Sequence, residues 1–420
     1  MARVLLLVPT ATYRVADFLE AARALGVDVV IGGDQAHAWP DLMGRRSVQV
    51  PLDDPEAAAD AIVAHDAVAP LDAVVAVDDR GAVAAAVAAR RLGLRHNDPG
   101  AVAATRDKLV MRLRLGAAEV SQPVFAPVPA TAGPDDVARL VETVGLPCVI
   151  KPTMLSASQG VLRADTTEDA IAVVDRVRRI AAGATAACDG PLLLERFVAG
   201  PEVAVEGLLT DGDLAVLAVF DKPDPLDGPA FEETIYVTPS RLAPTDLSAV
   251  AAVAAGACRA LGLTEGPVHA EVRVRDGRAS VIEVAARTIG GLCARTLTFS
   301  TGRTLEQLVL AHALGRQMGP TKRQARASGV LMLPIPRAGI LEGVEGRDAA
   351  LRAPGVTDVQ ITIAPGRRVV PVPEGDRYLG FVFARGRTPD AVEAALRHAQ
   401  TLLDVRVTPD PDASAIPAGT

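Results

Sequence analysis

Hydrophobic and polar positions along the first 95 residues follow strand-like and helix-like periods in turn. Short apolar runs over 3–8, 27–31 and 73–77 predict buried strands, and amphipathic stretches over 16–25, 55–65 and 81–92 predict helices. This alternation is typical of a small, doubly wound parallel sheet. The first strand is not followed by a G-x-G-x-x-G turn, so a dinucleotide-binding oxidoreductase would lack its glycine fingerprint. We therefore expect an N-terminal α/β domain over residues 1–95, built on this sheet.

The pattern then changes to longer helices and antiparallel-type strands. Asp98-Pro99 predicts a capped helix start, and we expect one helix from there through Lys108 to Leu115. The strand 146–151 ends on a lysine and precedes the polar loop 156–160. A helix over 168–182 and strands over 192–197 and 202–209 follow.

The strongest local pattern is a hairpin around the Asp-Gly turn at 276–277. A two-residue loop would place Glu271 opposite Ile282. A three-residue loop, with the glycine in a left-handed bulge position, pairs Val272 with Ile282 and Glu271 with Glu283, and it matches apolar with apolar side chains. Carboxylates that face each other repel unless a cation lies between them, and Mg²⁺ prefers such oxygen ligands. The alternative is two solvated glutamates on a sheet surface.

Short strands at 330–333, 356–363 and 380–385 and a helix over 389–403 predict a small α+β unit at the C-terminal end. The residues after 408 contain three prolines, and we expect a flexible tail.

Composition narrows the class of protein. The chain has 49% hydrophobic residues, but its apolar runs stay shorter than the roughly 18 residues of a membrane span. The net charge of −8, without a basic cluster, argues against nucleic acid as a partner. Its four cysteines are scattered, without the spacing of a zinc or redox site. We expect a cytoplasmic protein with no membrane partner.

Lysine is unusually rare. Of 43 basic residues only Lys108, Lys151, Lys222 and Lys322 are lysines, which suggests that some of them lie where a compact ammonium is needed. Lys151 comes directly before the polar loop and suits phosphate binding. For Lys108 the alternative is an ordinary surface lysine.

A further cation and two glycines follow the second hairpin carboxylate. Arg287 comes four residues after Glu283 and is suited to offset charge on a transferring phosphoryl group. Gly290-Gly291 exposes backbone N–H groups that suit an anion, although an ordinary turn is the alternative.

In this order the motifs resemble the ATP-grasp superfamily over nearly the whole chain. The elements are the segment 105–108, the strand 149–152 with its loop, the segments 192–198 and 200–202, and the hairpin with its arginine. The resemblance implies ATP and Mg²⁺ as cofactors, with Mn²⁺ as an alternative cation. It also implies phosphate binding by Lys108, Lys151 and the loop, an adenine hinge, a ribose ligand, metal ligands and a catalytic arginine. By this resemblance the phosphates would be bound by Lys108, Lys151, Ser156, Ser158 and Gly160, and the adenine hinge would be formed by Glu195, Arg196, Phe197 and Val198. Glu202 would be the ribose ligand, Glu271 and Glu283 the metal ligands, and Arg287 the catalytic arginine.

The resemblance also implies the domain organisation, in which residues 1–95 form a Rossmann-like N-terminal domain. We expect an ATP-grasp domain over 96–320, with subdomains over about 96–190 and 191–320 that clasp ATP. A C-terminal α+β domain over 321–407 and the tail 408–420 complete the chain.

Two stretches resemble the substrate loop of L-amino-acid ligases, a carboxylate–amine branch of that superfamily. They are 220–223 and 228–236, where Glu233 would receive the substrate ammonium. Tyr236, His269, Arg287, Gly290 and Gly291 would complete the substrate pocket. Ala285 departs from the pattern of many members, which carry a metal-binding asparagine there, so the number of metal ions stays open.

The expected activity is amide-bond formation, dipeptide-like, through an acyl phosphate, with amino acids as the small-molecule carboxylate and amine substrates. A homodimer is left open. One alternative is an ATP-grasp ligase for a carboxylate or amine that is not an amino acid. Another is a catalytically degenerate nucleotide-binding protein, which Ala285 would favour.

Overall fold

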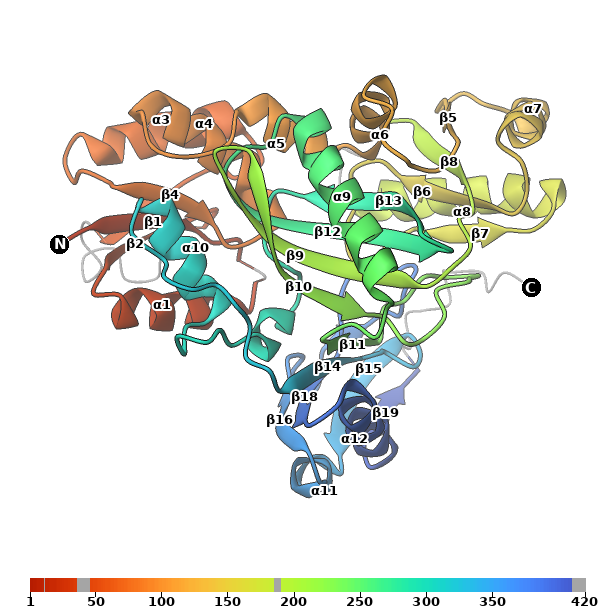
Figure 1. Cartoon of the computed structure of the whole chain (residues 1–420). Helices are drawn as coiled ribbons and strands as arrows, with labels where there is room; N and C mark the ends of the chain where they lie inside the picture. Colours follow the sequence, from red (N-terminus) through yellow and green to blue (C-terminus); the bar gives the residue numbers. More distant parts are fainter. Residues whose placement is uncertain (11, 36–45, 185–189, 410–420) are drawn as a thin grey trace.

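The computed structural model describes residues 1–10, 12–35, 46–184 and 190–409. Three lobes surround a long central sheet (Figure 1). The expected tail from residue 410 onward and Cys188 lie outside the described residues.

The N-terminal lobe confirms the predicted parallel sheet. Its strands run in the order β3-β2-β1-β4 and all pair in parallel. The helix α4 ends at Gly93 in the left-handed conformation, and a 3₁₀ turn, η2, leads from β4 into α4. The elements are β1 (Arg3–Leu7), α1 (Val15–Ala24), β2 (Asp28–Gly33), β3 (Ser47–Gln49), α3 (Pro55–Asp66), β4 (Ala73–Ala76), η2 (Asp79–Gly81) and α4 (Ala82–Leu92).

The prediction of a single helix from Asp98 to Leu115 is wrong. The chain forms α5 (Pro99–Arg106) and α6 (Lys108–Ala117), separated by Asp107 in an extended conformation. The Asp107 carboxylate accepts hydrogen bonds from the N–H groups of Leu109 and Val110, so it caps α6. This break places Lys108 in the first turn of the second helix.

The next lobe is a four-stranded antiparallel sheet in the order β5-β8-β6-β7, covered by two helices. Its elements are β5 (Phe125–Val128), α7 (Pro134–Val144), β6 (Cys148–Pro152), β7 (Leu162–Ala164), α8 (Thr167–Ala184) and β8 (Leu192–Arg196).

The central sheet has eight strands, in the order β13-β12-β9-β10-β11-β14-β18-β16. Helix α9 packs on its β12–β13 end, and α12 packs near β14 and β18 (Figure 1). Its strands and helices are β9 (Glu202–Thr210), β10 (Asp213–Asp221), β11 (Ile235–Thr238), α9 (Pro244–Leu261), β12 (Gly266–Arg275), β13 (Arg278–Ala285), β14 (Ala327–Leu333), β16 (Val356–Ile361), β18 (Gly380–Gly386) and α12 (Pro389–Thr401).

The C-terminal unit therefore continues the central sheet through the pairing of β11 with β14. It also contains α11 (Arg347–Arg352) and a small sheet of β17 (Arg368–Val369), β15 (Gly339–Glu345) and β19 (Asp404–Thr408). Between β13 and β14, the 3₁₀ turn η3 (Cys293–Thr296) and α10 (Leu305–Ala313) share one apolar core with α1. The exact limits of the domains stay a prediction.

The hairpin brings Glu271 opposite Glu283, as predicted, but by a different route. The turn has two residues, 276 and 277, both with positive φ, and a bulge at Ile282 then shifts the register so that Val272 pairs with Val281. The predicted three-residue loop and the pairing of Val272 with Ile282 are wrong. A bulge leaves one residue unpaired, so it achieves the same shift as a longer loop.

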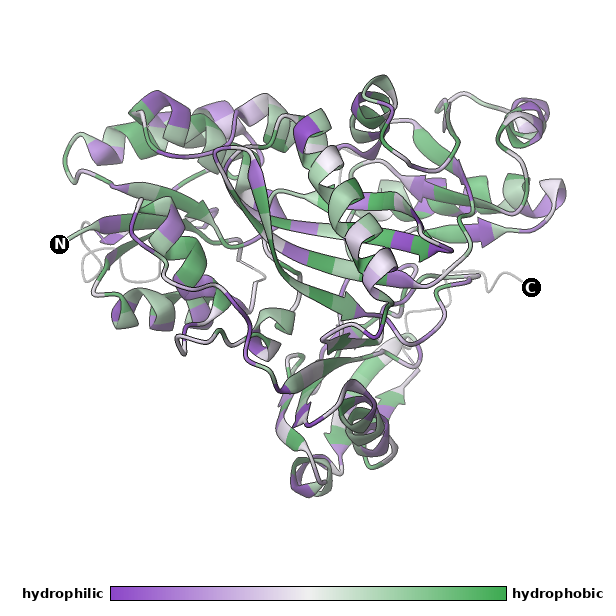
Figure 2. Ribbon diagram, in the orientation of Figure 1, coloured by the Kyte–Doolittle hydropathy of each residue, from purple (hydrophilic) through white to green (hydrophobic). Residues whose placement is uncertain are grey.

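Hydrophobic residues follow the strands, and hydrophilic residues gather on the outer helices and loops (Figure 2). In the described parts of the chain, no helix is both long and apolar enough to cross a membrane.

Candidate active site

A cavity of about 1020 Å³ lies where the lobes meet. The ends of β1 and β4 open onto it with the segments 12–14 and 78–80. Every predicted site residue except Gly160 lines this cavity: Lys108, Lys151, Ser156, Ser158, Glu195, Arg196, Phe197, Val198, Glu202, Glu233, Tyr236, His269, Glu271, Glu283, Arg287, Gly290 and Gly291.

Lys151, at the end of β6, is held by a buried ion pair. Its Nζ lies 2.8 Å from Oε2 of Glu195, whose other oxygen lies 2.6 Å from Nε of Arg112. Burial opposes the charged carboxylate, but the two cations outweigh it and lower the pKa of Glu195 to about 2. The Glu195 side chain thus fixes a lysine in the cavity wall, while the role of the 195–198 segment as adenine hinge stays a prediction.

Lys108 approaches the hairpin from the first turn of α6. Its Nζ lies 3.2 Å from Oε1 of Glu283 and 2.6 Å from the carbonyl oxygen of Leu155. The side chain is only 6% exposed, so the alternative of an ordinary surface lysine is wrong.

The polar loop is tied to the C-terminal unit. The Gly160 N–H donates to the Pro373 carbonyl at 2.9 Å, and Nε2 of Gln159 donates to the Glu374 carbonyl at 2.9 Å. Gly160 has a φ of +70°, and a Cβ there would meet Pro152 at 2.9 Å. Gly160 therefore lies against Pro152 and does not line the cavity, whereas Ser156 and Ser158 do.

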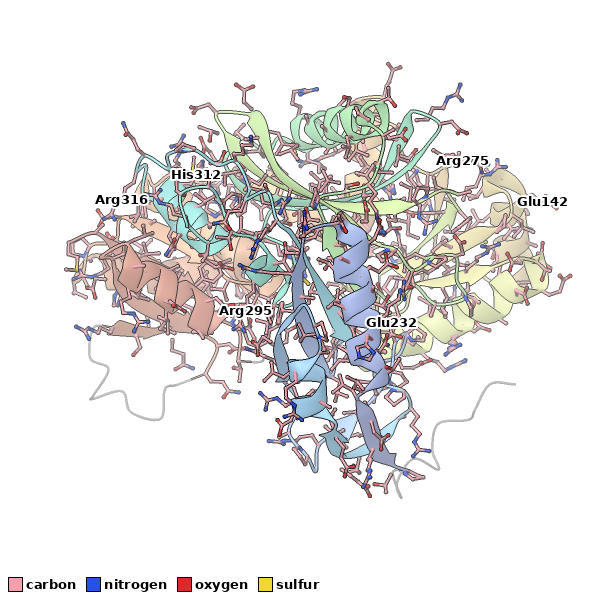
Figure 3. The ribbon with its side chains drawn as sticks, turned by 60° about the horizontal axis from the view of Figure 1, so that its bottom comes forward. Glu142, Glu232, Arg275, Arg295, His312 and Arg316 are labelled. Atoms are coloured by element: carbon pink, nitrogen blue, oxygen red, sulfur yellow. The ribbon has the colours of Figure 1, made fainter. Side chains whose placement is uncertain are left out.

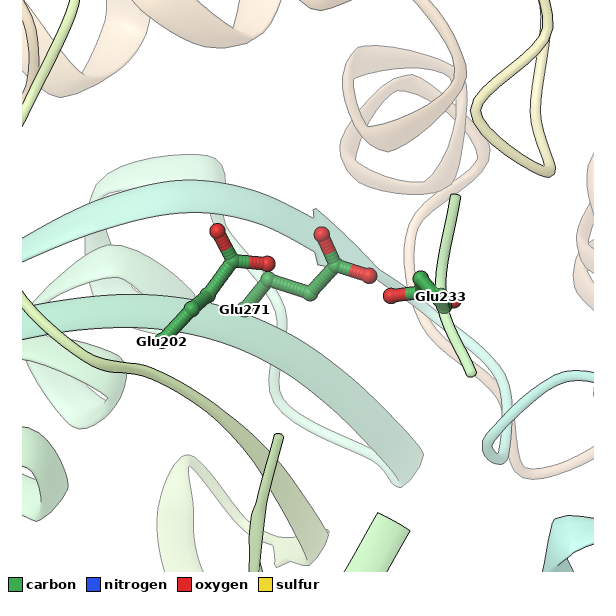
Figure 4. A group of neighbouring side chains, drawn as sticks. All are labelled: Glu202, Glu233 and Glu271. Atoms are coloured by element: carbon green, nitrogen blue, oxygen red, sulfur yellow. The ribbon is translucent and has the colours of Figure 1, made fainter. Parts of the chain in front are cut away.

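Three carboxylates converge in the cavity around one lysine. Glu202, Glu233 and Glu271 lie close together, with ligand atoms within 4.8 Å of one another (Figure 4). Nζ of Lys222 lies 2.7 Å from Glu202, 3.4 Å from Glu271, and pairs with Glu233 as well. Lys222 is 8% exposed and meets three acids, so its single positive charge offsets part of their negative charge.

Lys222 was not among the predicted site residues, although the rarity of lysine among the basic residues could have pointed to it. Glu202 also pairs with Arg273, at 2.8 Å from Nε, so both of its oxygens are engaged in ion pairs. Its role as ribose ligand stays a prediction. Tyr236 donates its hydroxyl hydrogen bond to Oε1 of Glu233 at 2.5 Å, which fixes the carboxylate predicted to receive an ammonium.

His269, on β12, lies between a carboxylate of the neighbouring strand β9 and one of its own strand. Its Nδ1 lies 2.7 Å from Glu206 and its Nε2 lies 3.6 Å from Glu271. Burial opposes the charged imidazolium, but hydrogen bonds to the two carboxylates outweigh it and raise the pKa of His269 to about 9.

Arg287 is held by an acid from the N-terminal lobe. Its Nε lies 2.8 Å from Oδ1 of Asp79, and NH1 of Arg106 lies 3.1 Å from the same oxygen. These cations hold the pKa of the buried Asp79 well below its usual range, although burial acts in the opposite direction. Asp79 was missed because the sequence gives no sign that η2 meets the segment after β13.

The donor set fits a magnesium–nucleotide group. Glu271 and Glu283 are cross-strand neighbours on the cavity wall, and carboxylate oxygens are hard ligands of the kind Mg²⁺ takes. Lys108, Lys151 and Arg287 line the same cavity and carry the opposite charge that a triphosphate requires.

Comparisons with known families and relatives agree with this arrangement. The family descriptions "ATP-grasp N-terminal domain", "ATP-grasp domain" and "L-amino acid ligase C-terminal domain 2" match residues 19–96, 144–296 and 331–408. The crystal structure of an L-amino acid ligase from Bacillus licheniformis has a TM-score of 0.79 and 26% identity, covering 97% of this chain and 99% of that one.

Two curated relatives are ligases or synthases by name. The alanine–anticapsin ligase of Bacillus subtilis is 28% identical over 242 residues, 54% of this chain and 50% of that protein. Dapdiamide A synthase of Enterobacter agglomerans is 26% identical over 282 residues, 63% of each chain. The chain thus spans about half to two thirds of the length of the curated relatives that it matches.

Proposed function

We propose that this chain, which belongs to the ATP-grasp superfamily and resembles its L-amino-acid ligases, joins a carboxylate to an amine with ATP and Mg²⁺. The product is an amide, dipeptide-like when both substrates are amino acids, and the by-products are ADP and phosphate. One observation carries the proposal. Lys108, Lys151 and Arg287 surround the same cavity as the facing carboxylates of Glu271 and Glu283.

In the first step, a substrate carboxylate oxygen attacks the γ-phosphorus of ATP and ADP leaves. Glu271 and Glu283 would hold Mg²⁺, which when bound would supply positive charge next to the transferring phosphoryl group. Lys108, Lys151 and Arg287 offset the negative charge that spreads over the transferring group. Most of the catalysis is positional, because Glu195 and Asp79 fix two of these cations before substrate binds.

In the second step, the amine attacks the carbonyl carbon of the acyl phosphate, loses a proton, and phosphate leaves. Glu233 receives the ammonium of an amino-acid substrate, held in place by Tyr236 and Lys222. The loop 156–160, bonded to the segment 373–374, keeps water away from the reactive intermediate.

An ADP-release screen tests the proposal. Amino acids are offered in pairs with Mg-ATP, and parallel reactions contain hydroxylamine to trap an acyl phosphate as a hydroxamate. We expect ADP and hydroxamate with at least one amino acid. Binding of Mg-ATP without ADP release for any combination would contradict the ligase in favour of a nucleotide-binding protein.

A further inference from the structure

We infer that the cavity contains a second anion subsite, formed by Arg14 and Tyr378, which binds an acidic side chain of an amino-acid substrate. The inference rests on the proposed function and specifies its substrate class. It concerns a carboxylate other than the one that is phosphorylated.

Arg14 is a buried cation without an acidic partner among the residues that the structure describes. It lies just before α1, is 4% exposed, and lines the cavity. Its guanidinium donates a hydrogen bond to Oγ1 of Thr288 and lies 5.6 Å from the centre of the Phe18 ring. Burying a charge is costly unless an opposite charge accompanies it, so a ligand carboxylate would offset this cost.

The acids nearest to Arg14 do not fill this role. Asp17, one turn along, lies 2.9 Å from Nε of Arg295, which sits between the N-terminal lobe and the C-terminal unit (Figure 3). Glu306, on α10, is 4% exposed; burial raises its pKa and so favours its neutral form, although the charge of Arg14 acts in the opposite direction. The positive charge of Arg14 therefore remains available to a ligand.

Tyr378 supplies an independent observation from the C-terminal unit. It is 8% exposed and lines the cavity, and its hydroxyl is buried without a hydrogen-bond partner among the described residues. A buried hydroxyl is normally hydrogen-bonded, so this one is poised to donate to a group that enters the cavity. Its ring lies 6.3 Å from that of Phe381, which in turn contacts Tyr13, the neighbour of Arg14.

Arg14 and Tyr378 line the same cavity as Glu233 and Arg287. Arg14 donates to Thr288, the residue after Arg287. Burial, and after it the charge of Glu233, raises the pKa of Tyr378 well above its usual value, so its hydroxyl keeps the proton that it would donate. In the proposed subsite, a substrate whose ammonium lies at Glu233 places its acidic side chain at Arg14 and Tyr378. A carboxylate accepts from both a guanidinium and a hydroxyl, whereas a side-chain amide offers a single uncharged oxygen. The geometry favours amino acids of the aspartate or glutamate type over their amides.

The experiment compares acidic amino acids with their amides. L-Glutamate, L-aspartate, L-glutamine and L-asparagine are each offered to the full chain with Mg-ATP, singly with hydroxylamine and pairwise with L-alanine, and ADP release gives kcat/KM. We expect the acids to exceed the amides by about 10- to 100-fold, as hydrogen bonds to charged groups would supply. Arg14→Met should remove this preference, Arg14→Lys should retain part of it, and Tyr378→Phe should reduce it.

Arg23→Met, exposed on α1, is the matched control and should keep the preference. Mg-ATP binding by each variant checks that it is folded, and Tyr378→Phe keeps the test valid if Arg14→Met does not fold. ADP release without any preference for acids, or an acid preference that Arg14→Met and Tyr378→Phe retain, would overturn the subsite alone. No ADP release with any amino acid, while Mg-ATP binds, would overturn the proposed function and the subsite with it.

Discussion

Nε of Arg287 lies 2.8 Å from Oδ1 of Asp79, so an arginine that follows the β12–β13 hairpin is oriented by a carboxylate from the N-terminal lobe. Asp79 also binds Arg106 and is 9% exposed. The N-terminal lobe thus lines part of the cavity and also orients Arg287 within it.

Replacing Asp79 with Asn should lower kcat with little effect on the KM for ATP. The amide removes the charge that holds the Arg287 guanidinium, and a small displacement of a catalytic group costs about 10- to 100-fold in rate. Steady-state ADP release checks this. Asp60→Asn, which removes an exposed acid paired with Arg91, should leave kcat unchanged; an equal loss in both variants would contradict a specific role for Asp79.

Glu195→Gln should lower the free energy of unfolding at pH 7 by about 3–5 kcal/mol, because Lys151 and Arg112 would remain buried without their counter-charge. The pKa of Glu195 is lowered on folding to about 2, so its contribution is complete above the unfolded value near 4.5. It is lost as the pH falls from about 4.5 toward 2. Denaturant unfolding at several pH values should show the wild type and variant converging in that window, and a constant difference would contradict the assignment.

Lys222→Met should destabilise the protein by a similar amount, about 3–5 kcal/mol, since the three carboxylates would lose the one cation that meets all of them. Added Mg²⁺ should restore part of this loss by binding between them. Thermal unfolding with and without Mg²⁺ measures both effects. Lys322, the exposed fourth lysine, provides the control variant Lys322→Met, and similar behaviour of the two variants would exclude a special role for Lys222.

Glu283→Gln should lower turnover by about 100-fold or more while the chain still binds ATP, because the variant loses a proposed metal ligand that also faces Lys108. ADP release and nucleotide binding, measured on the same preparation, separate the two effects. Glu342→Gln, at an exposed position of β15, should be fully active. Retained activity in Glu283→Gln would contradict the metal assignment.

The parts of the fold and site that the sequence predicted are those set by local pattern. The parallel N-terminal sheet follows from alternating apolar runs, and the facing of Glu271 and Glu283 follows from the hairpin. The break at Asp107 was missed because an aspartate can either lie inside a helix or cap the start of a new one. The local sequence does not show which of the two occurs.

The remaining site residues depend on contacts between distant segments. Lys222 meets Glu202 and Glu271 only because β9, β10 and β12 lie side by side, and Asp79 meets Arg287 only because the N-terminal lobe packs on the central sheet. Periodicity and turn chemistry report local structure, so they carry no information about such pairs.

The most direct test of the acyl-phosphate ligase is the fate of the substrate's carboxylate oxygen. A carboxylate substrate labelled with ¹⁸O is incubated with Mg-ATP and its amine, and the released phosphate is examined by mass spectrometry. An acyl phosphate requires one labelled oxygen to pass from the carboxylate to the phosphate, so we predict singly labelled phosphate in amounts equal to ADP. Unlabelled phosphate released with ADP would mean that water attacks ATP directly, and it would contradict the account.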